Sequence, residues 1–165
     1  MYNPLAQHTK YVRKRASLTS MLPSKNQEPK LTREGANKCF GCGQDNPIGL
    51  RLSFRQENGR TTGCFVPDEV HQGWPGLVHG GILFTILDEA MGYTFYAEGT
   101  NGVTARAETR FRRPAPIGEP LLIEATVTKR TKKLIEAKAT MTFSDGRTVA
   151  EGKALMYIVN NHSVE

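Results

Sequence analysis

Three residues ahead of a helix-like segment, and one acid within it, carry the strongest chemical signal in this sequence. His79-Gly80-Gly81 precedes a run with the apolar spacing of a helix, and Asp88 follows His79 by nine residues. Paired glycines at a helix start let a ligand approach free backbone N–H groups, where the helix dipole favours negative charge. A carboxylate can act as a general base or as a nucleophile. Together these groups suit acyl transfer, in which negative charge develops on an oxygen.

One helix over about Gly80–Ala97 accounts for this spacing. Projection at 100° per residue places Asp88 and Glu89 on one half of its surface, with Phe84 at the border beside Asp88. The opposite half is apolar and consists of Ile82, Leu83, Ile86, Leu87, Ala90 and Met91. We expect this apolar half to face the core. Asp88 is the candidate for chemistry, and Glu89 is interpreted as its solvated neighbour or as a contact between subunits.

The distance between Gly80 and Asp88 has a consequence for assembly. Eight residues separate them, which is roughly 12 Å along a helix axis at 1.5 Å per residue. An N–H donor and a carboxylate that act on the same substrate must both lie within about 3 Å of the reacting atoms. If both are catalytic, Gly80 of one subunit must therefore act with Asp88 of another, which predicts at least a dimer.

Two further segments flank this motif, CFGCGQDNPIGL at Cys39–Leu50 and FRRPAPIG at Phe111–Gly118. With these three segments in this order, the chain resembles hotdog-fold acyl-CoA thioesterases, especially the phenylacetyl-CoA-thioesterase-like branch. The resemblance extends from about Cys39 to Val159. The resemblance implies an α+β fold, in which an antiparallel six-stranded sheet wraps around one long central helix. It also implies hydrolysis of an acyl- or aryl-CoA thioester to free acid and CoA by a homodimer or a dimer of dimers.

The same resemblance implies roles for residues of the motif. Asp88 would be the general base or nucleophile, and the Gly80 N–H would polarise the carbonyl, while His79 orients the turn into the helix. Related enzymes place an Asn or Gln six residues before the motif histidine, where this chain has Gly73. The adjacent Gln72 is therefore the candidate for orienting the carbonyl or the water, with His71 a poorer one.

Further candidates follow the helix. Thr104 stands ten residues before Pro114, where the family tends to place a Ser or Thr that contacts the catalytic acid or water. Arg112 and Arg113 are candidates for binding the phosphates of CoA. Within the helix segment, the candidates for substrate binding are Gly81, Phe84 and Met91.

The remaining periodicity is that of strands. Leu50, Leu52 and Phe54 alternate with polar residues, and Asn58-Gly59 is typical of a two-residue hairpin turn. Residues 67–78 are predicted to be a loop. Strands are expected near Arg60–Val66, Val103–Arg113, Leu121–Arg130, Leu134–Phe143 and Arg147–Val159. Two strands, one helix and four strands indicate an α+β domain.

Charge divides the 165 residues into two parts. Residues 1–38 hold eight basic and two acidic residues, while the rest holds fourteen of each, so the net charge of +6 belongs to this extension. We predict a basic extension over 1–38 and a thioesterase-like domain over 39–165. The neutral domain gives no argument for a nucleic-acid partner. An organellar presequence in the extension remains an alternative to a cytoplasmic location, and no apolar run suggests a membrane span.

Other motifs and functions have weaker support in the sequence. Cys39-x-x-Cys42 is interpreted as a tight structural turn, because no second Cys/His pair follows to complete a zinc site. No cofactor-binding motif is present, so neither a metal nor a cofactor is expected. A non-catalytic acyl-CoA-binding sensor on the same fold is the main alternative to an enzyme, and Asp88 argues against it. A hotdog hydratase is weaker, because no Asp/His pair has the spacing of that family.

Overall fold

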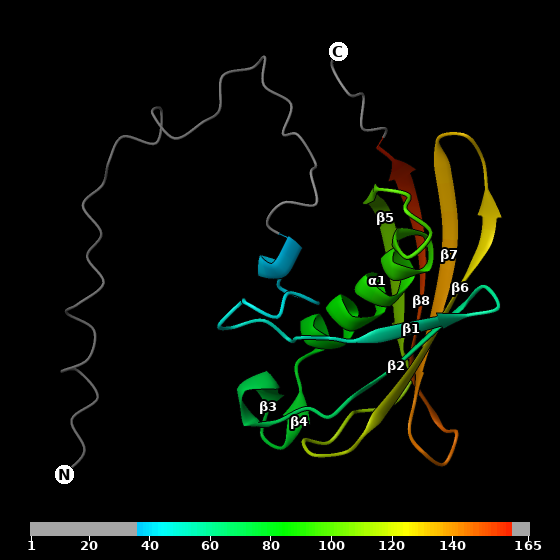
Figure 1. Ribbon diagram of the computed structural model, residues 1–165. Coiled ribbons are helices and arrows are strands. Elements are labelled where there is room, and N and C mark those ends of the chain that lie inside the picture. The colour runs from blue at the N-terminus through cyan, green and yellow to red at the C-terminus, as the bar shows by residue number, and fades with distance from the viewer. Residues whose placement is uncertain (1–35, 160–165) are drawn as a thin grey trace, which may run out of the picture. The chain divides into compact units, whose positions relative to one another are not determined.

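The computed structural model describes residues 36–159, so most of the basic extension lies outside the described residues. The helix α1 (Gly80–Tyr96) lies across one face of an antiparallel sheet with the strand order β1-β2-β6-β7-β8-β5 (Figure 1). The six strands are β1 (Phe54–Glu57), β2 (Arg60–Phe65), β5 (Gly102–Phe111), β6 (Leu121–Arg130), β7 (Leu134–Thr142) and β8 (Thr148–Ile158). The predicted α+β fold, with one helix held against six strands, is confirmed.

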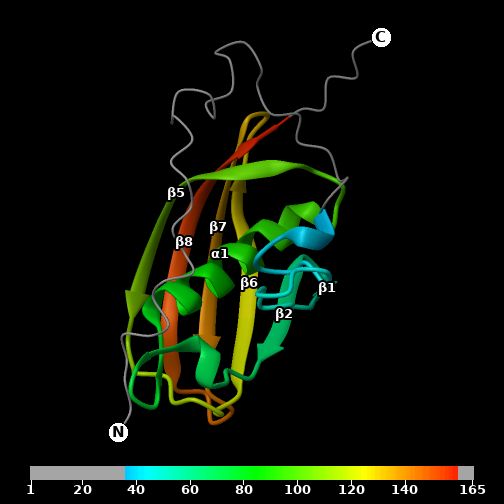
Figure 2. The ribbon, with the colours of Figure 1, turned by 90° about the vertical axis from the view of Figure 1, so that its left-hand side faces the viewer.

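The helix is held by its buried side. Figure 2 shows α1 running along the face formed by β6, β7 and β8. Its buried residues are Leu83, Ile86, Leu87, Ala90, Met91, Thr94 and Phe95, which include most of the predicted apolar half. Burial of a Leu or Ile side chain contributes about 1.5–3 kcal/mol. The Thr94 hydroxyl is satisfied within the helix, because it donates to the Met91 carbonyl at 2.7 Å.

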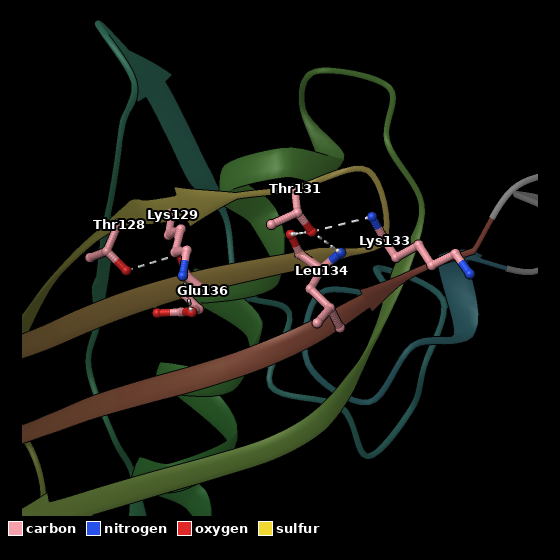
Figure 3. A network of polar contacts seen from close by, with 6 residues as sticks. All are labelled: Thr128, Lys129, Thr131, Lys133, Leu134 and Glu136. Carbon is pink, nitrogen blue, oxygen red and sulfur yellow. Dashed lines mark hydrogen bonds and ion pairs between the residues drawn. The ribbon is translucent and has the colours of Figure 1, made fainter.

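Turns with specific chemistry join neighbouring strands. Asn58 and Gly59 have φ of 51° and 74°, the left-handed geometry that a two-residue hairpin needs. At the β6–β7 hairpin the Thr131 hydroxyl accepts the Leu134 N–H at 2.9 Å (Figure 3). Further from the turn, Lys129 of β6 and Glu136 of β7 form an ion pair at 3.7 Å. These local bonds fix the register of the two strands at this end of the sheet.

Two sequence expectations need correction. The first strand begins at Phe54 rather than Leu50, because Arg51 has φ of 52°, which no strand accommodates. Leu50 and Leu52 are nevertheless buried, as the alternation predicted. The predicted loop before α1 contains a 3-10 turn at Glu69–His71 and a small hairpin of β3 (Gln72–Trp74) and β4 (Leu77–Val78). Among the described residues no helix is long and apolar enough to span a membrane.

One buried group generates a prediction about stability. The Thr61 side chain in β2 is 0% exposed, and its hydroxyl has no hydrogen-bond partner among the described residues. Thr61→Val keeps the shape and removes this unsatisfied group, so we expect the free energy of unfolding to rise by about 1 kcal/mol. Urea unfolding of both proteins measures the difference. Thr62→Val, at an exposed position on the other face, is the matched control and should leave stability unchanged.

Candidate active site

The N-terminus of α1 offers a free N–H donor. His79 is the N-cap residue, and its Nδ1 accepts the Gly81 N–H at 2.8 Å. The next two amides, of Ile82 and Leu83, donate to the His79 carbonyl. Within residues 36–159 the Gly80 N–H has no acceptor. His79 thus orients the turn, as expected, and Gly80 keeps the one donor of this turn that is available to a ligand.

This donor opens into a cavity of about 500 Å³. The lining residues come from the small hairpin, the start of α1 and the segment after β5: Gly73, Trp74, Leu77, Val78, His79, Gly80, Leu83, Phe111, Arg112, Arg113, Pro114 and Ala115. Trp74 and Phe111 are 73% and 51% exposed. A large exposed aromatic residue on each side of a free N–H makes this end of the helix a binding surface for a partly apolar ligand.

Gln72 lies beside this cavity but not in its lining. Its Oε1 accepts the Gly76 N–H at 2.7 Å, which closes the turn between β3 and β4. Gly73, the residue after it, packs so closely on His79 that a Cβ there would stand 2.8 Å from the His79 Cβ. In this structure Gln72 therefore holds the hairpin that supports His79, and its predicted role toward substrate stays a prediction.

The carboxylate of Asp88 lies at a second cavity, of about 260 Å³. The Thr104 hydroxyl of β5 donates to Asp88 Oδ1 at 2.8 Å, so the contact expected between these residues is present. The cavity is lined by Cys39, Cys42, Asp88, Glu89, Gly92, Tyr93, Phe95, Tyr96, Gly102, Thr104 and Met156. A fixed carboxylate therefore faces a pocket whose other walls are mainly apolar and aromatic.

The two cavities share no lining residue. Gly80 belongs to the first and Asp88 to the second, and about 12 Å of helix separates them. In a single chain the free N–H and the carboxylate therefore cannot reach one substrate carbonyl. The arrangement is that of two half-sites on one helix.

The predicted substrate contacts Met91 and Phe84 lie outside the linings of both cavities. Met91 is 1% exposed and lies in the core, as expected for the apolar half of α1, where its methyl group packs at Gly152 of β8. Met156 of β8 lines the second cavity. Phe84 is 37% exposed but lines neither cavity. The predicted contacts of Met91 and Phe84 with substrate stay predictions.

The two arginines after β5 also differ. Arg112 forms an ion pair with Glu151 at 2.7 Å through Nη2, and its Nε donates to the same oxygen. Arg113 donates to the Thr148 carbonyl, and no ion pair within residues 36–159 includes it. Arg113 therefore has the charge available for an anionic ligand at the first cavity.

A cluster that the sequence reasoning missed lies at the second cavity. The thiols of Cys39 and Cys42 and the carboxylate of Glu89 have ligand atoms within 4.8 Å of one another. All three residues are half-buried, so Glu89 is not fully solvated, and its alternative role as a contact between subunits stays a prediction. Burial, and then the Glu89 carboxylate, raise the pKa of the Cys42 thiol far above its usual range. The Cys-x-x-Cys spacing was visible, but only the fold brings Glu89 beneath it.

Comparison with known proteins relates the chain to thioesterases. Residues 75–150, which include the N-terminus of α1 and Asp88, match the Thioesterase superfamily. The chain is 30% identical over 107 residues to acyl-coenzyme A thioesterase THEM4 of Bos taurus, covering 62% of this chain and 44% of that protein. It is 29% identical over 96 residues to acyl-coenzyme A thioesterase 13 of Mus musculus, covering 56% of this chain and 69% of that protein.

Solved structures agree on the fold. A hypothetical thioesterase of Streptococcus pneumoniae, solved with coenzyme A, superposes with a TM-score of 0.63 at 19% identity, covering 68% of this chain and 88% of that one. The PaaI protein of the E. coli phenylacetic acid degradation operon gives 0.63 at 20% identity, covering 67% and 81%. The described part of the chain therefore has the hotdog fold of these solved structures. The chain spans less than half the length of the bovine relative.

The raised pKa of Cys42 predicts its reactivity. Alkylation needs the thiolate, and each unit of pKa above the ambient pH lowers the thiolate fraction tenfold. At pH 8, in buffer with EDTA, we expect iodoacetamide to modify Cys42 at least about tenfold more slowly than the exposed Cys64. Fragment mass spectra of time points separate the sites. Glu89→Gln removes one cause of the shift and should accelerate Cys42 but not Cys64. Equal rates for Cys42 and Cys64 in the wild type would contradict the prediction.

Proposed function

We propose that this protein hydrolyses an acyl- or aryl-CoA thioester at a site formed by two subunits. The observation that carries the proposal is the separation of a free Gly80 N–H and a Thr104-bound Asp88 carboxylate into two cavities of one chain. The family and the named activity of the relatives support thioester hydrolysis. Acyl-CoA is the proposed substrate, and a second copy of the chain is the proposed partner.

The edge of the sheet supports a paired assembly. β5 is an edge strand of ten residues, and only β8 pairs with it among the described strands. A long edge strand with unpaired N–H and C=O groups is a template for pairing with another chain. Thr104 lies on this strand and Phe111 ends it. Pairing along β5 would therefore bring the Asp88 half-site of one subunit toward the Gly80 half-site of its partner.

Each group then has a defined task. The Gly80 N–H of one subunit donates to the thioester carbonyl oxygen, with the helix dipole adding to the stabilisation of the developing oxyanion. Asp88 of the other subunit either takes a proton from an attacking water or attacks the carbonyl carbon itself. Thr104 holds the carboxylate in place. The C–S bond then breaks, and CoA leaves as a thiolate that takes up a proton. If water attacks, the free acid forms directly. If Asp88 attacks, the free acid forms after hydrolysis of the anhydride made with Asp88.

Binding groups for the two ends of the substrate fall on different surfaces. The cavity at Asp88 is walled by Tyr93, Phe95 and Met156, which suits a short or aromatic acyl group. Arg113 is the proposed contact for a CoA phosphate, since the charge of Arg112 is already paired with Glu151. The nucleotide would then remain at the protein surface.

The proposed donor can be removed by a proline substitution, because proline has no backbone N–H. Gly80 is the first helical residue, where proline is well tolerated, and His79 has φ −63° and ψ 132°, which a following proline favours. Gly80→Pro should therefore keep the fold but lower kcat about 10²- to 10³-fold, the usual effect of losing one oxyanion donor. Gly80→Ala retains the N–H, and its Cβ would meet Phe111 at an ordinary 3.6 Å. Equal kcat values for the two variants would contradict the role.

The carboxylate is tested by Asp88→Asn, which keeps the size of the side chain. We expect kcat to fall at least ~10²-fold with acyl-CoA binding retained, since the charge is needed for attack and not for affinity. Steady-state hydrolysis is measured across short-chain, long-chain and aromatic acyl-CoAs, and binding by calorimetry. Tight binding without turnover in the wild type would indicate a sensor. Unchanged turnover in the variant would exclude Asp88.

Mixing the two defective proteins tests the shared site directly. In a heterodimer of Gly80→Pro and Asp88→Asn chains, one site carries both defects and the other carries neither. Random pairing should therefore restore about a quarter of wild-type activity, as the symmetry of a twofold dimer requires. Co-expression with two different tags supplies the heterodimer for assay. If purified heterodimer is as inactive as both parents, the half-sites are not shared.

A further inference from the structure

We infer that Cys39, Cys42 and Glu89 form a binding site for one thiophilic divalent cation of the zinc class. Cys39 Sγ lies 3.6 Å and 3.8 Å from the two carboxylate oxygens of Glu89. Around tetrahedral Zn²⁺, bonds of about 2.3 Å to sulfur and about 2.1 Å to oxygen separate the two ligand atoms by about 3.6 Å. The Cys39 thiol and the Glu89 carboxylate are therefore already spaced as one edge of such a tetrahedron, and the ligand atoms of all three residues lie within 4.8 Å of one another.

The backbone around the cluster is built to hold this spacing. Gly43 N–H donates to the Cys39 carbonyl at 3.0 Å, which turns the chain so that both thiols face α1. The Phe40 and Gly41 carbonyls accept amides of Leu50 and Leu52 at 2.8 and 2.9 Å. At Gly41 a Cβ would overlap the Glu89 carboxylate. The loop thus lies directly on the acid, and ligand groups positioned before binding need little rearrangement to bind a metal ion.

Charge gives a second and independent reason. Glu89 is half-buried, and no ion pair within the described part of the chain includes it. Its carboxylate accepts hydrogen bonds from the thiols of Cys39 and Cys42, which are weak donors. A partly desolvated carboxylate without a cation is costly. A divalent ion would neutralise it, and both thiols would bind as thiolates after releasing their protons to solvent.

The donor set selects the kind of ion. Two sulfurs exclude Mg²⁺ and Ca²⁺, which prefer oxygen ligands, whereas a mixed set of two sulfurs and one carboxylate is typical of Zn²⁺. Cys39, Cys42 and Glu89 supply three ligands, and all three line the cavity that holds Asp88. The fourth position is therefore open to that cavity, where water would complete the tetrahedron.

The experiment uses the full chain, reduced, freed of metal with EDTA and then desalted. Titration with Co²⁺ should give visible bands of a tetrahedral ion and a thiolate charge-transfer band, saturating at one ion per chain, and Zn²⁺ should displace it. Cys42→Ser and Glu89→Gln should each weaken Co²⁺ binding at least about 100-fold, since the loss of a mere outer partner already costs 10- to 100-fold. The near-isosteric Glu89→Gln guards against misfolding, and circular dichroism checks both variants.

Cys64→Ser is the matched control, because Cys64 is the exposed cysteine outside the cluster. It should bind Co²⁺ as the wild type does. The proposal is overturned if reduced wild-type protein shows no thiolate charge-transfer band, or if Cys42→Ser retains the band. It is also overturned if the two cysteines are found as a disulfide and the protein binds no metal once this disulfide has been reduced. The readout is spectroscopic, so the result does not depend on whether the protein hydrolyses a thioester.

Discussion

Seven residues of α1 are buried against the sheet, and this packing makes the helix a rigid element whose two functional positions cannot move independently. Gly80 begins the helix and Asp88 lies two turns further along, so the distance between them is a property of helix geometry and not of any loop. Substitutions that loosen the buried side would displace both groups together. The separation of the two cavities, and with it the proposed need for a second subunit, depends on this one contact between helix and sheet.

Elements on either side of the helix then position its polar groups. The β3–β4 hairpin supports His79 through Gly73, and Gln72 closes the turn of that hairpin. At the other end, Thr104 of β5 fixes Asp88 with one hydrogen bond. A helix and an edge strand that meet at a single polar contact can hold a carboxylate precisely while leaving its second oxygen open to a ligand. The two proposed catalytic positions, Gly80 and Asp88, therefore lie on one helix, while loop residues complete the cavities around them.

The sequence predicts the parts of this arrangement that follow from local periodicity. The helix bounds, the Asn58-Gly59 turn and the later strands agree with the structure because burial patterns and turn chemistry are local. The contact between Thr104 and Asp88 followed only from the resemblance. The burial of Met91 followed from the helix projection, whereas its packing partner Gly152 is distant in sequence and became visible only in the fold. The alternation of apolar residues predicted a strand from Leu50, but the left-handed φ of Arg51 delays its start. Alternation gives no information on φ.

The adjacent acids Asp88 and Glu89 show why the rest required the fold. Consecutive helix residues point about 100° apart, so one turns toward β5 and the other toward the loop that begins at Cys39. Their identical charge is thus placed in two chemical environments, a hydroxyl for Asp88 and two thiols for Glu89. A carboxylate that is held by a hydroxyl and open to a cavity can act on a substrate. One that is covered by thiols and a glycine has no such freedom, and a cation is the partner that its surroundings lack.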